Sequence, residues 1–259
     1  MYIRKPYIFV AKKTSILLPM FLFIILSYGV VANEYQPAEP VLSYSLANQL
    51  IVIDPGHGGF DPGAWRGELM EKNITLSISK KLQQHLSQAG AIVVMLREED
   101  KDLAGEQFKG SLKERKRQDL KARVDEANRL KADLYISIHT NADPSPRWFG
   151  AQTFYNARSE ESKIMAECVQ DELTRILGNT KRKAKPGSYY IIDKTKMPAV
   201  IVEVGFLSHP TEAKLLNDPA YQNKVAYAVF SGVVNYQASQ MEPADKSDKK
   251  IVTGSDIAK

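Results

Sequence analysis

The feature that most constrains the fold of this sequence is the alternation of short apolar runs with longer segments of helical periodicity. Leu50-Ile51-Val52-Ile53 is a continuous apolar run that ends at Asp54-Pro55-Gly56, which is typical of a buried strand. Five similar runs follow, at Ala91–Leu96, Leu134–Ile138, Gln152–Tyr155, Tyr189–Ile192 and Ala199–Val204. Strands that alternate with helices predict an α/β fold. We expect a single domain with a mixed, mostly parallel sheet of about six strands and helices on both faces.

Apolar residues that recur every three to four positions predict the helices between these strands. Such segments lie near Ile74–Leu82, Ser111–Ala127, Ile164–Leu177 and Tyr221–Tyr236. Gly90 follows the first as a stop signal, and Ser111-Leu112-Lys113-Glu114 has the pattern of a capping box. The connection from His139 to Ala151 is short and proline-rich, too short for a helical crossover. We therefore expect the strand near residue 152 to run antiparallel to the strand before it.

The N-terminal region is basic and then strongly apolar. Four cations precede the apolar run Ile16–Ala32, namely Arg4, Lys5, Lys12 and Lys13. This arrangement is typical of an export signal, although the run also reaches the lower length limit for a membrane-spanning helix. An apolar core helix is the remaining alternative. We assign residues 1–32 to a signal peptide or membrane anchor and expect the rest of the chain to act outside the cytoplasm, secreted or membrane-anchored.

Composition divides the remaining chain into three parts. Residues 33–47 begin with a proline-containing polar stretch and are interpreted as a linker. Residues 48–238 contain the predicted strands and helices and form the expected catalytic domain. Residues 239–259 are polar and charged without apolar periodicity, which predicts a disordered tail. The single cysteine, Cys168, excludes a disulfide within the chain and is expected to pack as a small hydrophobic residue.

The net charge of +5 suits a partner rich in carboxylate or phosphate, such as a bacterial wall or a nucleic acid. Acidic residues are mixed through the basic cluster at residues 109–123, and aromatic residues are not interleaved with it. We interpret the cluster as a solvated helix face and expect no nucleic-acid partner. The dense basic segment Lys181-Arg182-Lys183-Ala184-Lys185 is either a site that attracts an anionic glycan or ordinary surface.

Two histidines come directly after predicted strands. His57 lies in Asp54-Pro55-Gly56-His57-Gly58-Gly59, whose glycines allow a sharp turn, and His139 follows Ile136-Ser137-Ile138. Because sites in open α/β sheets form at the carboxyl ends of strands, both imidazoles are expected in one crevice. Glu71 lies at the expected start of a helix that follows the first strand. Glu203 lies inside an apolar run, where an unpaired carboxylate is costly to bury.

Two imidazoles, one carboxylate and an open fourth position are typical of catalytic zinc. His57, Glu71 and His139 fit the three ligand positions, and Glu203 fits a general base. The spacing alone leaves a structural role for each histidine open, because the four residues are scattered along the chain. The other two histidines, His85 and His209, are expected at the surface or in packing.

Four phrases, in this order, resemble the zinc-dependent N-acetylmuramoyl-L-alanine amidases: Ile53–Gly59, Glu71-Lys72-Asn73, Ser137–Ala142 and Val202–Ser208. The resemblance spans about residues 49–238. It implies one Zn²⁺ ion bound by the positions matching His57, Glu71 and His139, with Glu203 as the catalytic glutamate. Asn141, inside the third phrase, is a candidate either to contact the substrate or to brace the loop. Some members of this family carry an inserted helix over the zinc. Residues 156–189 leave no room for one, so we expect an open site.

Further phrases are similar to the sporulation amidases of this family: Arg97–Ala104, Arg182–Lys185 and Gly205–Pro210. This likeness implies removal of peptide from muramic acid in spore cortex, a step toward the muramic-δ-lactam that germination enzymes recognise. It implies a peptidoglycan substrate and action at the extracytoplasmic face of the membrane or in the forespore intermembrane space, with an accessory lipoprotein as a further candidate partner. A wall-binding protein with an inactive site, and a zinc hydrolase of another amide such as an N-acetyl group, are the competing hypotheses.

Overall fold

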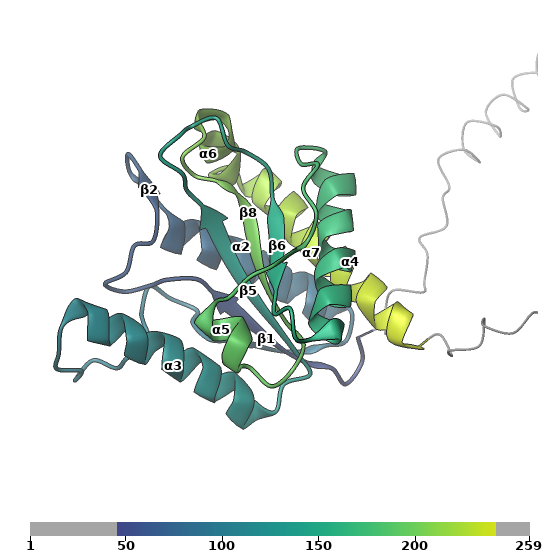
Figure 1. The fold of residues 1–259 in the computed structure, drawn as a ribbon, viewed down its shortest axis with the longest axis horizontal. Helices are drawn as coiled ribbons and strands as arrows, with labels where there is room; N and C mark the ends of the chain where they lie inside the picture. Colours follow the sequence, from purple (N-terminus) through teal and green to yellow (C-terminus); the bar gives the residue numbers. More distant parts are fainter. Residues whose placement is uncertain (1–45, 242–259) are drawn as a thin grey trace, which may run out of the picture. The chain divides into compact units, whose positions relative to one another are not determined.

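Six strands form one mixed sheet in the order β4-β1-β5-β8-β6-β7 in the computed structural model, which describes residues 46–241 (Figure 1). The strands are β1 (Leu50–Pro55), β4 (Ile92–Met95), β5 (Leu134–Asn141), β6 (Gln152–Tyr155), β7 (Lys185–Pro186) and β8 (Ala199–Phe206). The predicted export segment, most of the predicted linker and most of the predicted tail lie outside the described residues. The predicted α/β class and the six-stranded sheet are confirmed.

The pairing of the strands confirms a mostly parallel sheet. β1 pairs in parallel with β4 and β5, and β5 pairs in parallel with β8. β6 runs antiparallel to β8, and therefore opposite to β5, as the short connection after His139 predicts. The neighbour of β6 is β8 rather than β5, because β8 lies between these two strands in the sheet.

The prediction of a strand at Tyr189–Ile192 is wrong. This segment forms the short helix α5 (Tyr190–Lys194), and the sixth strand of the sheet is instead β7. The Asp193 N–H donates to the Tyr189 carbonyl at 2.9 Å, which is a helical hydrogen bond. A short apolar run is compatible with either structure, and here the consecutive Ile191 and Ile192 are both buried within one helical turn.

Helices cover both faces of the sheet, as predicted (Figure 1). The helices α2 (Glu71–Gln88), α4 (Glu160–Leu177) and α7 (Pro219–Met241) share one apolar core with Ile51, Ile53 and Val202 of the strands. The helices α3 (Leu112–Leu130) and α5 share a second core with Val52 and Ile201. Because successive strand residues point to opposite faces, these two sets lie on opposite sides of the sheet.

The remaining elements lie at the ends of the sheet. A hairpin of β2 (Trp65–Arg66) and β3 (Leu69–Met70) precedes α2, and the short helix α6 (Pro210–Leu216) follows β8. The predicted capping box at Ser111 is confirmed, because its side chain and that of Glu114 bind each other's backbone N–H. Within residues 46–241, each helix is too short or too polar to span a lipid bilayer.

Candidate metal centre

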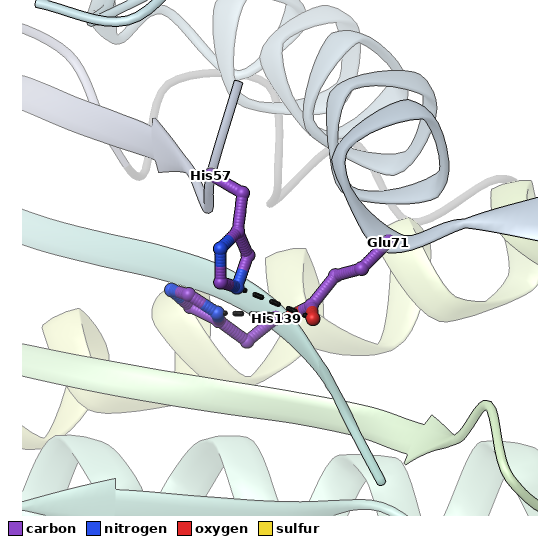
Figure 2. A group of neighbouring side chains, drawn as sticks. All are labelled: His57, Glu71 and His139. Carbon is purple, nitrogen blue, oxygen red and sulfur yellow. Dashed lines mark hydrogen bonds and ion pairs between the residues drawn. The ribbon is translucent and has the colours of Figure 1, made fainter. Parts of the chain in front are cut away.

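The structure brings the three predicted ligand residues together at the carboxyl-terminal edge of the sheet (Figure 2). His57 lies just after β1, Glu71 is the first residue of α2, and His139 lies near the end of β5. One ligand atom from each residue lies within 4.8 Å of the other two. The two imidazole rings meet edge to face, with centroids 4.9 Å apart.

The carboxylate of Glu71 lies between the two histidines and is buried. Its Oε1 is 3.0 Å from His139 Nδ1, and its Oε2 is 3.2 Å from His57 Nε2. The backbone N–H groups of Thr140 and Ala64 donate to the same two oxygens, at 2.9 and 2.8 Å. Burial acts to raise the pKa of Glu71, but the hydrogen bonds from the two histidines outweigh it and lower the pKa. The carboxylate is therefore ionised and fixed in place.

His57 is held by a second carboxylate, Asp61, which no motif in the sequence indicates. Its Nδ1 lies 2.9 Å from Asp61 Oδ2, and Lys116 Nζ lies 2.9 Å from the same oxygen. Burial acts to lower the pKa of His57, but Asp61 and Glu71 outweigh it and raise the pKa to about 9. The cluster thus attracts positive charge. Two imidazoles, a carboxylate and an outer carboxylate on one imidazole are a donor set that suits a metal ion such as zinc.

Two glycines leave room for these side chains. A Cβ atom at Gly56 would lie 2.4 Å from the ring of His139. A Cβ atom at Gly63 would lie 2.5 Å from Glu71 Oε2 and 2.7 Å from His57 Cδ2. Gly63 also has a φ of +68°, a left-handed conformation that favours glycine. The backbone next to His57, Glu71 and His139 can therefore approach them closely because both positions lack a side chain.

Two buried arginines fix the backbone of the turn that carries His57. Arg123 Nη2 donates to the His57 carbonyl at 2.7 Å, and Arg123 Nη1 donates to the Pro55 carbonyl at 3.0 Å. Arg97 donates to the Pro55 and Gly56 carbonyls, both at 2.9 Å. These bonds hold a turn in which His57 itself has a φ of +63°.

Arg123 was expected on a solvated helix face, and this expectation is wrong. Its side chain is only 1% exposed, because it forms an ion pair with the buried Asp54 at the end of β1. Its Nε also donates to Asp119 at 3.0 Å. The hydroxyl of Tyr135 donates to Asp54 at 2.7 Å and completes the network. Asp119 and Arg123 are one helical turn apart, and both flank the apolar Leu120 and Val124, which is the pattern that indicates this burial.

Glu203 lies next to His139 in the sheet. The two residues are paired in the register of β5 and β8, and both line a cleft of about 330 Å³ together with His57 and Tyr189. Among the described residues, Glu203 Oε2 is buried without a hydrogen-bond partner. Burial raises the pKa of Glu203 to about 7 against the opposing charge of His139. An unpartnered carboxylate beside the ligand cluster is able to accept a proton from a molecule bound in the cleft.

The other residues considered from the sequence lie outside this cluster. Asn141 is the last residue of β5, and its carbonyl accepts a hydrogen bond from Leu207 at 2.8 Å. His85 stacks on Phe230, and His209 precedes α6 as its N-cap, so both have the packing roles expected of them. The helix α4 packs in the core on the far face of the sheet and does not cover the cleft.

Comparisons with known proteins agree with this geometry. The sequence profile of Amidase_3, described as N-acetylmuramoyl-L-alanine amidase, matches residues 51–235. The germination-specific N-acetylmuramoyl-L-alanine amidase of Bacillus subtilis is 45% identical over 204 residues, which cover 78% of this chain and 86% of that protein.

Two solved structures share the fold. The CwlD amidase of Clostridioides difficile, in complex with the GerS lipoprotein, is 36% identical, with a TM-score of 0.72 over 74% of this chain and 100% of that one. The catalytic domain of the amidase CwlV of Bacillus (Paenibacillus) polymyxa is 33% identical, with a TM-score of 0.63 over 73% and 98% of the two chains. This chain therefore belongs to the N-acetylmuramoyl-L-alanine amidases, which hydrolyse the amide bond between N-acetylmuramic acid and L-alanine in peptidoglycan.

Proposed function

We propose that His57, Glu71 and His139 hold one zinc ion for this amidase reaction and that Glu203 is its general base. The observation that carries the proposal is the convergence of three ligand atoms within 4.8 Å beside the unpartnered carboxylate of Glu203. A zinc ion held by these three residues would polarise the carbonyl of the scissile amide and would lower the pKa of a water molecule toward neutrality.

The protein's own residues then move the proton. Glu203 Oε2, which has no partner among residues 46–241, accepts a proton from the water that attacks the lactyl carbonyl. The same oxygen passes the proton to the departing nitrogen of L-alanine as the C–N bond breaks. Burial raises the pKa of Glu203 toward neutral pH, and a carboxyl group tuned in this direction is suited both to accept and to release a proton.

The hydrogen bond from His57 to Asp61 holds the imidazole in the orientation that metal binding requires. A hydrogen bond between Nδ1 and Asp61 leaves Nε2 free to face Glu71 and the metal position. Outer carboxylates of this kind fix the ring orientation and the tautomer of a metal-binding histidine. Asp61 thus acts as a positioning residue through His57.

We also propose that the wall acted upon is spore cortex and that the product feeds formation of muramic-δ-lactam for germination. The support is the 45% identity to a germination-specific amidase over 86% of its length. A cell-wall amidase acts outside the cytoplasm, and we propose that residues 1–32 direct the chain there as a signal peptide or membrane anchor. Deletion of the gene should leave sporulation intact but yield spores whose cortex lacks muramic-δ-lactam. Normal lactam content would contradict the cortex assignment.

A lipoprotein is the proposed partner, because the similar CwlD amidase of Clostridioides difficile was solved in complex with one. The test is purification of the full chain from sporulating cells under mild conditions, followed by mass spectrometry of what accompanies it. The proposal is supported if a lipoprotein is recovered in a fixed ratio to this chain and is absent when the same purification is made from cells that lack this chain. Recovery of the full chain alone, with full activity, contradicts it.

A further inference from the structure

Arg182 is a fixed cation that the proposed mechanism does not use. Its Nε donates to the Phe149 carbonyl at 3.2 Å, and its Nη1 donates to Gln152 Oε1 at 3.3 Å. The guanidinium also stacks on the ring of Phe206, 5.0 Å from the centroid, and on that of Trp148, at 5.8 Å. The side chain is half-buried, so these contacts determine its orientation.

This cation has unused hydrogen-bonding capacity. A guanidinium carries five N–H donors, and the two hydrogen bonds above leave the others free. Within residues 46–241 no carboxylate forms an ion pair with Arg182, whereas Arg115, Arg123, Arg129 and Arg175 each have at least one. Oriented donors of this fork geometry suit a carboxylate from another molecule.

Arg182 lies close to the strand that carries the proposed catalytic base, Glu203. Gln152, which accepts its hydrogen bond, is paired with Glu203 in the register of β6 and β8. Paired residues of antiparallel strands project from the same face of a sheet, about 5 Å apart. Phe206, under the guanidinium, ends the strand that carries Glu203. Arg182 therefore lies one strand beyond Glu203, on the side away from His139.

The chemistry of the substrate limits which group can meet this cation. In uncleaved peptidoglycan the lactyl carboxyl of muramic acid is part of the scissile amide and carries no charge. Free carboxylates belong to the stem peptide, on the leaving side of the bond. The first of them is the α-carboxylate of the second residue, D-isoglutamate, which lies about two residues or ~7 Å beyond the scissile nitrogen. Neighbouring strands lie about 5 Å apart. A carboxylate at that distance from the scissile nitrogen can therefore reach a subsite one strand away from Glu203.

We propose that Arg182 is a specificity-determining residue that binds the free α-carboxylate of the second stem-peptide residue. The inference rests on the proposed function, because it takes the scissile amide to lie between the metal cluster and Glu203. It predicts that the enzyme distinguishes stem peptides in which this carboxyl is free from those in which it is amidated.

The experiment uses the full zinc-loaded chain and two synthetic peptidoglycan tetrasaccharides with tripeptide stems. The substrates differ only at the α-carboxyl of the second residue, which is free in one and amidated in the other. We expect kcat/KM of the wild type to favour the free acid by about tenfold, as a charge-assisted hydrogen bond provides. Arg182→Gln retains a hydrogen-bond donor without charge and should reduce this preference to about twofold or less, whereas Arg182→Lys should retain part of it.

Lys181→Ala is the matched control, because it removes one exposed positive charge from the neighbouring position. It should leave the preference of the wild type unchanged, which separates a placed guanidinium from the general field of the basic segment. An unchanged preference in Arg182→Gln, or a wild type that cleaves both substrates equally, would overturn the inference. A wild type that cleaves neither substrate contradicts the proposed function itself, and a zinc assay and circular dichroism of each variant exclude misfolding as the cause.

Discussion

Glu203 differs from His57, Glu71 and His139 in its hydrogen bonding. The side chains of His57, Glu71 and His139 are paired with one another, whereas the buried Oε2 of Glu203 has no partner among the described residues. A buried carboxylate without a partner costs free energy in the folded state, so a functional role is the most direct explanation of its position. The role of base and the roles of ligands can be separated by substitution.

Glu203→Gln should lower kcat by about 10²–10⁴-fold, because the amide cannot accept the proton of the attacking water. Zinc content should remain at one ion per chain, since the ligand cluster is untouched. The measurement pairs release of stem peptide with zinc analysis of the same preparation. Glu106→Gln, at an exposed position, is the control and should retain full activity. Near-full activity of Glu203→Gln would show that the base is another group.

Asp61→Asn should weaken zinc binding by about 10- to 100-fold, because the amide orients the His57 imidazole less firmly than a carboxylate does. Competition with a chromophoric chelator gives the zinc affinity directly. Asp125→Asn removes an exposed carboxylate on α3 and should leave the affinity unchanged. Equal zinc affinity of Asp61→Asn and the wild type would remove Asp61 from the metal centre.

At the scale of elements, the turn after β1 and the hairpin before α2 determine where the ligands meet. The sequence predicts β1 and the start of α2, because an apolar run and helical periodicity specify each one locally. The hairpin β2–β3 was not predicted, because two-residue strands are too short for alternation to appear. The hairpin returns the chain to the segment just before it, where Gly63 and Ala64 lie next to Glu71.

Gly63→Ala should strongly reduce zinc binding, because its Cβ atom would meet Glu71 Oε2 and His57 Cδ2 at less than 3 Å. Gly67→Ala is a matched control within the hairpin. Gly67 also has a positive φ, of +57°, but nothing lies within 4 Å of its added Cβ atom. Both variants should lose about 1–2 kcal/mol of unfolding free energy from the left-handed backbone, and only Gly63→Ala should lose zinc. Loss of zinc in both variants, or in neither, would contradict this geometry.

The buried network of Asp54, Arg123 and Tyr135, which links β1 to α3, should make the free energy of unfolding depend on pH. Burial acts to raise the pKa of Asp54, but Arg123 and the Tyr135 hydroxyl outweigh it and hold the pKa below its usual value. A lowered carboxyl pKa stabilises the fold above the pKa of the unfolded chain, about 3.9, and this contribution is lost as pH falls below it. Urea unfolding of zinc-free protein between about pH 6 and 2.5 should show the loss.

Asp54→Asn should reduce this dependence on pH, because the titrating group is absent, and should also lower the free energy of unfolding at pH 6. The second effect arises because Arg123 would be left buried without its carboxylate. Asp125→Asn should retain the pH dependence of the wild type, since Asp125 is exposed on the surface of α3. If the free energy of unfolding changes with pH equally in the wild type and in Asp54→Asn, other carboxylates cause the pH dependence.

At the scale of the whole molecule, the sequence predicted the sheet, its mixed direction and the carboxyl-terminal edge at which the site lies. These features follow from local patterns: apolar runs, helical repeats and polar residues at strand ends. The contacts of Arg123 with the turn could not be predicted in the same way, because Pro55 and His57 are more than 60 residues from it in the sequence. Asp61 is only four residues from His57, but their contact depends on the turn at His57, whose positive φ no apolar run or helical repeat predicts. The helix at Tyr190–Lys194 was missed because a short apolar segment fits both a strand and a helix.

We propose that this chain removes whole stem peptides from peptidoglycan through a zinc site with Glu203 as base. The most direct test incubates the zinc-loaded full chain with spore-type and vegetative peptidoglycan and resolves the muropeptides by mass spectrometry. We predict release of stem peptides with free L-alanine amino groups, abolished by a chelator and by Glu203→Gln. Intact muropeptides with zinc bound, or release of acetate in place of peptide, would contradict the claim.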